Sequence, residues 1–363
     1  MKILFYINAL SGGGAERVLT TLLHHFSKDI SLELCLATNT TIPFAYSLPN
    51  SIRIINLYEG CNIKHNKTFN FFSYRIPYLV NIRKIAKREH PDIIIVFMGN
   101  SISNVILMTL GLGIPIIGSE HTNVSRSFGR VFELKRKILY PFASAITVLT
   151  KYDYNLWSKK FSNIVRMPNP CDFKVINSVY KKDKRVIAVG RVSDWEIKGF
   201  DNLVRAWSKI CHEVPEWQLS IVGKYDIDSL SFLKKIQSEN QGVNIEFLGF
   251  RNDVNRLLLE SEIFVLSSRV EGLPMGLIEA MKSKCCCVSF DVKTGPNEII
   301  KDGFSGLLVK DQDVNALAEK LLYVIKNENK RILFSQNAPL SVEQYSIENV
   351  IEKWYSLIKR FVK

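Results

Sequence analysis

Short, nearly continuous apolar runs recur along the first half of the chain and alternate with amphipathic segments. These runs lie at residues 2–7, 32–38, 92–98, 114–119 and 145–150. Apolar residues that continue without polar alternation over a short run are typical of parallel strands covered on both faces. Because helical patterns separate most of the runs, the first half is expected to form a doubly wound α/β sheet.

The second half repeats this rhythm after a break in the pattern. Two prolines interrupt residues 166–170, and a lysine-rich stretch follows before the apolar runs resume. Further strands are expected at 186–190, 218–223, 245–249, 263–267, 286–290 and 307–309. A chain of 363 residues also exceeds the roughly 250 to 300 residues that one hydrophobic core serves. We therefore predict two domains, over residues 1–168 and 169–345.

The last segment, residues 346–363, has the pattern of an amphipathic helix. Ser346 is a suitable N-cap, and Glu348 places an acid in the first turn. Apolar residues follow at helical intervals: Val350, Ile351, Trp354, Leu357, Ile358 and Phe361. This stripe can pack on either domain, including back on the first.

The sequence carries no signal for membrane insertion, export or disulfide bonding. No apolar run approaches the roughly 20 residues that span a bilayer, and the first ten residues lack a cleavage-site pattern. The seven cysteines are odd in number and form no CxxC pair, so neither a disulfide framework nor a zinc site is expected. Cys285, Cys286 and Cys287 fit a buried strand. We expect a cytoplasmic protein.

Positive charge is concentrated in the first half of the chain. Of the net charge of +13, residues 1–170 contribute +11 and residues 171–363 contribute +2. A basic half of this kind can bind nucleic acid, anionic lipid or a phosphorylated ligand, and the sign alone does not choose among them. The positive charge of the first half therefore indicates an anionic binding partner.

The segment EGLPMGLIE, residues 271–279, follows an expected strand and opens an expected helix, with Pro274 suited to the first turn. Ligands of α/β sheets bind beyond the carboxyl ends of strands. Free backbone N–H groups from Gly272 to Leu277 would face an anion there, and Glu279 projects from the same helix end. The segment can hold a phosphate and a sugar together.

In this segment the chain resembles the retaining glycosyltransferases of family 4, whose motif has two glutamates at the spacing of Glu271 and Glu279. The resemblance implies two Rossmann-like domains facing across a cleft, the GT-B type, with the acceptor bound by the first domain and the donor bound by the second domain. It assigns Glu271 to the donor sugar and Glu279 to the nucleotide ribose. The implied loop contacts are Gly272, Leu273, Pro274, Met275, Gly276 and Leu277.

A second match is Gly190-Arg191 followed by KGFD from Lys198, similar to a family segment whose cations hold the diphosphate. The departing nucleotide gains negative charge as the glycosidic bond breaks. Fixed cations stabilise that charge most in the transition state and can substitute for a metal. The resemblance therefore gives Arg191 and Lys198 catalytic and donor-binding roles; the alternative is two solvated surface cations.

Two matches fall in the first half. The loop containing Gly13 and Gly14 is similar to the glycine loop near the start of many members, where only glycine lets the backbone approach a phosphate or sugar. Arg17 replaces the third glycine of a dinucleotide fingerprint, which argues against a dehydrogenase. His121, within residues 119–123, matches the family histidine at the transfer site. A structural glycine turn is the alternative for the first match.

Beyond Gly249, Phe250 and Arg251 match the family loop that flanks the nucleotide base. Residues 291–298 resemble a late family segment, in which the role of Glu298 is left open because a helix-start acid explains it equally well.

The resemblance implies transfer of a hexose or N-acetylhexosamine from a nucleotide diphosphate, expected to be UDP, with retained anomeric configuration and without metal or other cofactor. The expected acceptor is a lipid-diphosphate-linked glycan of surface polysaccharide biosynthesis. Basic clusters at 83–88 and 135–137, with the aromatic stretch 69–78, favour docking on the anionic inner face of the cell membrane. Solvated helix faces are the alternative.

Three rival functions remain. A nucleic-acid-binding protein would explain the basic half but not the two motifs, and a salt-sensitive gel shift would favour it. A non-catalytic sugar-nucleotide binding module would not turn over UDP-sugars. An epimerase on a similar fold would alter a sugar without any acceptor.

Overall fold

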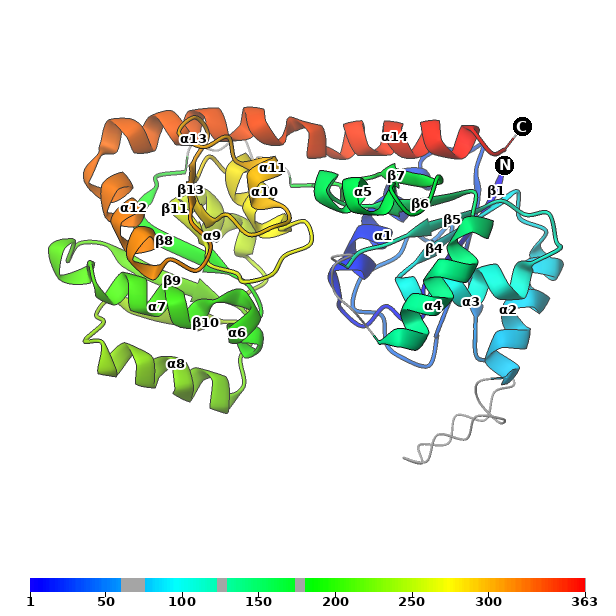
Figure 1. Cartoon of the computed structure of the whole chain (residues 1–363), viewed down its shortest axis with the longest axis horizontal. Coiled ribbons are helices and arrows are strands. Elements are labelled where there is room, and N and C mark those ends of the chain that lie inside the picture. The colour runs from blue at the N-terminus through cyan, green and yellow to red at the C-terminus, as the bar shows by residue number, and fades with distance from the viewer. Residues whose placement is uncertain (60–75, 123–128, 174–179, 363) are drawn as a thin grey trace. The chain divides into compact units, whose positions relative to one another are not determined.

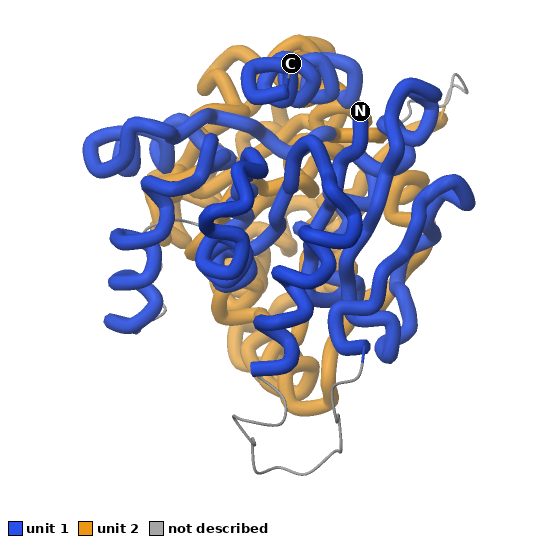
Figure 2. Tube along the Cα trace, turned by 90° about the vertical axis from the view of Figure 1, so that its right-hand side faces the viewer, with its two compact units in different colours: residues 1–170, 347–363 blue, residues 171–346 orange. Residues whose placement is uncertain are grey.

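The protein is described from a computed structural model, which covers residues 1–59, 76–122, 129–173 and 180–362. Two compact units make up the chain, as Figure 2 shows in two colours. Unit 1 comprises Met1–Pro170 together with Ile347–Lys363, and unit 2 comprises Cys171–Ser346. The last helix therefore belongs to unit 1.

Unit 1 contains a parallel sheet of seven described strands in the order β3-β2-β1-β4-β5-β6-β7. The strands are β1 (Lys2–Tyr6), β2 (Glu33–Thr38), β3 (Arg53–Asn56), β4 (Ile93–Phe97), β5 (Ile116–Ser119), β6 (Ala145–Val148) and β7 (Ile164–Arg166). The helices are α1 (Gly14–Phe26), α2 (Ile76–Glu89), α3 (Gly99–Thr109), α4 (Arg130–Leu139), α5 (Lys151–Trp157) and α14 (Ile347–Lys359), with the short η2 (Tyr140–Phe142).

Alternate residues of the unit 1 strands enter two different cores. Ile3 and Phe5 pack with α1 and α14, whereas Leu4 and Tyr6 pack with α2 and α3 on the opposite face (Figure 1). This two-residue alternation places apolar side chains on both faces, as the unbroken apolar runs predicted. Trp354 is fully buried in the first of these cores and fixes α14 on unit 1.

Unit 2 contains a parallel sheet of six described strands in the order β10-β9-β8-β11-β12-β13. The strands are β8 (Asp183–Val189), β9 (Gln218–Val222), β10 (Ile245–Gly249), β11 (Ser261–Leu266), β12 (Cys286–Phe290) and β13 (Leu307–Val309). The helices are α6 (Trp195–Lys198), α7 (Phe200–Ser208), α8 (Ile227–Glu239), α9 (Val254–Glu260), α10 (Met275–Lys282), α11 (Pro296–Ile299), α12 (Val314–Lys326) and α13 (Glu328–Val342), besides the short η3 (Val192–Asp194), η4 (Cys211–Glu213) and η5 (Glu343–Tyr345).

Both sheets reverse their strand order at one position, which confirms the prediction of two doubly wound sheets. The reversal lies between β1 and β4 in unit 1 and between β8 and β11 in unit 2. In doubly wound sheets a ligand binds outside the carboxyl ends of the strands at such a switch point. The topology therefore directs attention to the loops after β1 and β4 in unit 1, and to those after β8 and β11 in unit 2.

The six described cysteines are free and buried, as expected for core residues. Burial raises the pKa of the Cys286 thiol to about 12, so this thiol stays protonated. Cys61 lies outside the described residues. Within the described part of the chain, no helix is both long enough and apolar enough to cross a bilayer.

Candidate active site

Three glycines stand at the carboxyl ends of adjacent strands in unit 2: Gly190 after β8, Gly223 after β9 and Gly249 at the end of β10. The Gly223 amide donates to the Gly249 carbonyl at 2.9 Å. A Cβ on Gly223, where φ is +150°, would lie 1.8 Å from the Gly190 carbonyl oxygen. The three strand ends therefore pack backbone against backbone, and this close approach requires glycine.

Lys198 and Glu271, which are far apart in the sequence, form an ion pair at the switch point of unit 2. The Lys198 Nζ lies 2.8 Å from Glu271 Oε1, and the Ser268 hydroxyl donates to the same oxygen at 2.6 Å. Glu271 is only 9% exposed. The two residues that the motifs assigned to the diphosphate and the sugar are therefore brought together around one buried carboxylate.

Gly199 holds Lys198 in this position. The short helix α6 ends at Gly199, whose φ is +62°, and a Cβ there would lie 1.9 Å from the Ser267 carbonyl oxygen. The Ser267 hydroxyl in turn donates to the Lys198 carbonyl at 2.9 Å. The glycine of the KGFD segment thus lets the lysine-bearing turn approach the end of β11.

The turn that begins at Glu271 is supported from the late segment. The Thr294 hydroxyl donates to the Glu271 carbonyl. Gly295, with φ +97°, leaves room for Pro274, whose Cδ would lie 2.3 Å from a Cβ at position 295. Threonine and glycine at these positions therefore support the shape of the donor loop.

Helix α10 begins at Met275, with Pro274 as its N-cap residue. The amides of Met275 and Gly276 are at the helix start, where no intrahelical acceptor exists. The Leu277 amide differs from the expectation, because it donates to the Pro274 carbonyl at 3.1 Å. The predicted row of available N–H groups is therefore shorter by one at its C-terminal end.

The other predicted donor contacts of unit 2 lie in contrasting environments. Glu279 is buried in α10, only 6% exposed. Arg191 is exposed and pairs with Asp194 at 3.0 Å. The Phe250 ring is 71% exposed, and Arg251 is bidentate to Asp253 at 2.8 Å through both contacts. Gly272 is half-buried and Leu273 is buried.

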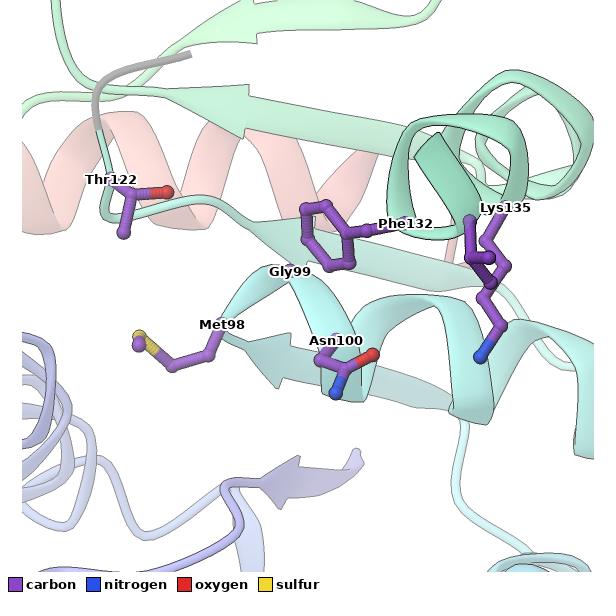
Figure 3. Close-up of a pocket in the computed structure, with 7 residues that line it drawn as sticks. Met98, Gly99, Asn100, Thr122, Phe132 and Lys135 are labelled. Atoms are coloured by element: carbon purple, nitrogen blue, oxygen red, sulfur yellow. The ribbon is translucent and has the colours of Figure 1, made fainter. Parts of the chain in front are cut away.

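Unit 1 has its own candidate site where β4 and β5 end. A pocket of about 360 Å³ opens there, lined by Met98, Gly99, Asn100, Thr122, Val131, Phe132 and Lys135 (Figure 3). Met98 has φ +76° and ψ 130°, a conformation that costs a non-glycine residue about 1 to 3 kcal/mol. Its amide donates to the Ser119 carbonyl at 3.1 Å, joining the two strand ends.

His121 lies two residues beyond the end of β5, between an aromatic ring and polar side chains. Its ring stacks on Phe97, with centroids 5.0 Å apart, and its Nε2 lies 3.0 Å from the Ser119 hydroxyl. Burial lowers the pKa of His121 to about 4, although a side-chain contact with Asn169 opposes the shift. The imidazole is therefore neutral at neutral pH. Asn123, the last residue of the matched segment, lies outside the described residues.

The glycine loop near the N-terminus already binds a carboxylate from its own helix. Gly13 is the N-cap of α1, and the amides of Gly12 and Gly13 donate to Glu16 Oε2 at 2.6 Å and 3.1 Å. A phosphate at Gly13 would have to displace this carboxylate. The first helical residue, Gly14, has no neighbour within 4 Å of the position of a Cβ, so it lies open.

The prediction that Arg136 belongs to the basic cluster that contacts the membrane is wrong. Arg136 is only 2% exposed and pairs with the buried Glu120 at 2.9 Å. In the sequence Arg136 is the middle cation of a basic run, and nothing in that run indicates that its side chain faces the core. No spacing or motif marks Met98 and Gly99, and Glu120 was assigned no role although it lies in the matched segment 119–123.

Comparison with known proteins identifies the family. Residues 12–175 match the family described as "Glycosyltransferase Family 4", and residues 172–341 match the family described as "Glycosyl transferases group 1". Together the two matches span residues 12–341, so the chain belongs to the glycosyltransferases that combine these two domains. It is a glycosyltransferase on two Rossmann-like sheets.

The most informative relatives act in bacterial surface glycan assembly. A Campylobacter jejuni protein, the GalNAc-α-(1→4)-GalNAc-α-(1→3)-diNAcBac-PP-undecaprenol α-1,4-N-acetyl-D-galactosaminyltransferase, is 29% identical over 99% of this chain and 98% of its own. The amylovoran biosynthesis glycosyltransferase AmsD of Erwinia amylovora is 28% identical over 98% and 99%. The solved structure of Anabaena HepE with UDP and glucose has the same fold, with a TM-score of 0.78, 15% identity and coverage of 99% and 100%.

Proposed function

We propose that this glycosyltransferase moves a hexose or N-acetylhexosamine from UDP to a hydroxyl of a lipid-diphosphate-linked glycan in surface polysaccharide biosynthesis, with retention and without a metal ion. The observation that carries the proposal is the ion pair of Lys198 with the buried Glu271 at the switch point of unit 2. It puts a cation and a carboxylate where a phosphate and a sugar would meet.

The ion pair has a simple chemical use. When the bond from the anomeric carbon to the diphosphate breaks, negative charge grows on the leaving phosphate. The ion pair of Lys198 with Glu271 would then weaken, and the Lys198 ammonium would stabilise that phosphate together with the exposed Arg191. Glu271 becomes free to accept hydrogen bonds from the sugar. We propose same-face attack through an oxocarbenium-like pair, with the leaving phosphate accepting the proton of the acceptor hydroxyl.

The neutral His121 suits a hydrogen bond to a sugar hydroxyl. A neutral imidazole offers one donor and one acceptor, whereas an imidazolium would offer donors alone. The low pKa of His121 keeps the acceptor nitrogen available throughout the physiological range. We propose that it orients a hydroxyl of the reacting sugar.

The choice of substrates rests on the relatives. The Campylobacter jejuni relative is named as an α-1,4-N-acetylgalactosaminyltransferase that acts on a diphospho-undecaprenol glycan, and a second Campylobacter jejuni relative, 25% identical over 93% of this chain, carries a similar name. An α product from an α-linked nucleotide sugar is a retained configuration. UDP is the nucleotide in the HepE complex.

We propose that helix α4 docks unit 1 on the anionic inner surface of the membrane. The helix exposes Val131, Leu134 and Ile138, at 71%, 57% and 54%, and Phe142 continues the stripe at 62%. Lys137 is exposed nearby. An apolar stripe flanked by cations is typical of interfacial helices. Of the second basic cluster, Arg83 is occupied by the carbonyls of Met108 and Leu110, and Lys84 and Lys87 are exposed.

Transfer assays test the activity. The full-length protein is incubated with UDP-GalNAc, UDP-GlcNAc, UDP-galactose and UDP-glucose, each with a diphospho-undecaprenol-linked glycan, with and without EDTA. We expect one α-linked product, identified by NMR of the new anomeric proton, in equal yield with EDTA. A β-linked product would contradict retention, dependence on the metal would contradict metal independence, and sugar alteration without acceptor would indicate an epimerase.

Co-sedimentation tests the membrane proposal. Vesicles with one third anionic lipid should retain the wild-type protein and lose most of the Leu134→Ser/Ile138→Ser variant. The matched control is Ile30→Ser, because Ile30 is fully exposed elsewhere on unit 1. Equal retention of all three proteins would contradict docking through α4.

A further inference from the structure

We infer that Glu120 is a positioning residue, which fixes the α4 wall of the unit 1 pocket and thereby sets the affinity for the acceptor glycan. Glu120 is 1% exposed at the carboxyl end of β5, next to His121. Its Oε1 accepts hydrogen bonds from Arg136 Nη2 at 2.9 Å and from the Tyr140 hydroxyl. The inference rests on one further assignment: because the donor motifs lie in unit 2, the acceptor glycan is assigned to this pocket of unit 1.

Among the described residues, few side chains of helix α4 are buried against the rest of unit 1. Of its ten residues only Arg136 and Leu139 are buried. The Arg136 guanidinium carbon lies 4.3 Å from the ring centre of Phe132 and 4.9 Å from that of Trp157. Most of the remaining surface of the helix faces outward. The ion pair with Glu120 is therefore a principal restraint on where α4 lies.

The same helix supplies one wall of the pocket. Val131, Phe132 and Lys135 line it from α4, while Thr122 lines it from the loop after Glu120 (Figure 3). A shift or rotation of α4 would move the Phe132 ring and the Lys135 ammonium relative to Thr122. Because Lys135 is the cationic side chain that lines this pocket, its position matters for an acceptor that carries a diphosphate.

Gly99 makes room for the Glu120 carboxylate beneath the pocket. A Cβ at position 99 would lie 2.6 Å from Glu120 Oε1 and 2.9 Å from Phe132 Cζ. Neither atom can move freely, since Glu120 is held by two partners and Phe132 packs on Arg136. The strained Met98 brings this glycine into place at the end of β4. Arg136 of α4, Tyr140 of η2 and Gly99 at the start of α3 thus surround the carboxylate of Glu120.

A buried ion pair is a poor device for stability alone. Removing two charges from water costs several kcal/mol per ion, and replacing such a pair by well-packed apolar residues is often neutral or stabilising. What a pair of this kind can supply is a single defined arrangement of the elements that it joins. Here those elements are the loop that bears His121 and the helix that lines the pocket.

The test compares Glu120→Gln with Glu133→Gln. Both variants remove a carboxylate partner of Arg136, but Glu133 is 45% exposed and lies 3.2 Å from Nη1. We expect Glu120→Gln to raise the KM for the lipid-linked acceptor about 10-fold or more, since a misplacement of about 1 Å can cost up to 10²-fold. The KM for the UDP-sugar should stay within about 2-fold of the wild-type value, because Glu120 makes no proposed contact with the donor. Glu133→Gln should resemble the wild type in both constants.

A second variant keeps the inference testable if Glu120→Gln folds poorly. Gly99→Ala retains every charge and hydrogen-bonding group, and the nearest atoms that its methyl group would meet belong to Glu120 and Phe132. It should raise the acceptor KM with little change in the donor KM. An unchanged acceptor KM in folded Glu120→Gln or Gly99→Ala would overturn the positioning role, even if the melting temperature fell.

A third variant separates this inference from the proposed acceptor site. Lys135→Ala removes the cation that lines the pocket and leaves the ion pair intact. If Lys135→Ala raises the acceptor KM but Glu120→Gln does not, the pocket binds the acceptor and the positioning role fails. If neither variant changes the acceptor KM, the acceptor binds elsewhere and the proposed use of the pocket fails.

Discussion

The two units share a doubly wound topology but differ in where and how they build a site: unit 2 at its switch point, and unit 1 beside it, where β4 and β5 end. In unit 2 glycines let the ends of three strands pack closely, and Lys198 is already paired with Glu271. In unit 1 the pocket borders a strained Met98 and a helix held largely by Arg136. Unit 2 thus has its cation and carboxylate already paired for the proposed donor, whereas in unit 1 the position of one pocket wall depends on a single buried ion pair.

Gly199→Ala should have the largest effect on unit 2. Its Cβ would meet the Ser267 carbonyl oxygen, so the substitution is expected to cost about 4 kcal/mol or more, in the range of severe core disruption. The control is Gly303→Ala, because Gly303 has a similar φ of +70° but nothing within 4 Å. It should cost only the conformational term of about 1 to 2 kcal/mol. Calorimetry on the full-length chain measures both, and equal destabilisation would refute the close approach.

Lys198→Ala tests whether the cation of unit 2 serves the reaction. We expect kcat to fall about 10²-fold or more, as for loss of a group that stabilises developing charge. Arg269→Ala is the matched control, since Arg269 is bidentate to Asp201 at 2.8 Å in the same unit. It should lower the melting temperature and largely retain kcat. The reverse outcome would make Lys198 a structural residue.

His121 gives unit 1 a pH dependence of stability. The unfolded chain takes up a proton at this histidine near pH 6.5, whereas the folded ring resists protonation until about pH 4. Its contribution is therefore present above pH 6.5 and is lost as the pH falls toward 4. His121→Asn should flatten the difference in urea midpoint between pH 7.5 and pH 5. An unchanged difference would contradict the lowered pKa.

Most of the fold could be predicted because its strands are unbroken apolar runs. Two strands escaped prediction, β3 and β7, which are short and lie at the edges of the unit 1 sheet. In β3, Arg53 and Ile54 are exposed, so its four residues show no buried run. Short edge strands of this kind form because they pair with a neighbouring strand, and their own sequence carries no clear pattern of buried residues.

The site in unit 2 was predictable because its residues stand in motifs, whereas the network in unit 1 was not. Glu120 meets Arg136 and Tyr140 from 16 and 20 positions away, through contacts that only the folded sheet creates. From sequence alone Arg136 was one cation in a basic run. Its burial is decided by the direction of α4, which the periodicity of ten residues did not fix.

The proposed function requires that the start of α10 in unit 2 binds the donor nucleotide, and titration calorimetry with UDP measures this binding. Glu279 is the buried carboxylate of that helix, proposed to accept hydrogen bonds from the ribose. We predict that wild-type protein binds UDP and that Glu279→Ala binds it about 10-fold or more weakly, the loss of about 1.4 kcal/mol or more expected for a charged hydrogen bond. An unchanged Kd for UDP in a folded Glu279→Ala variant would contradict the assignment.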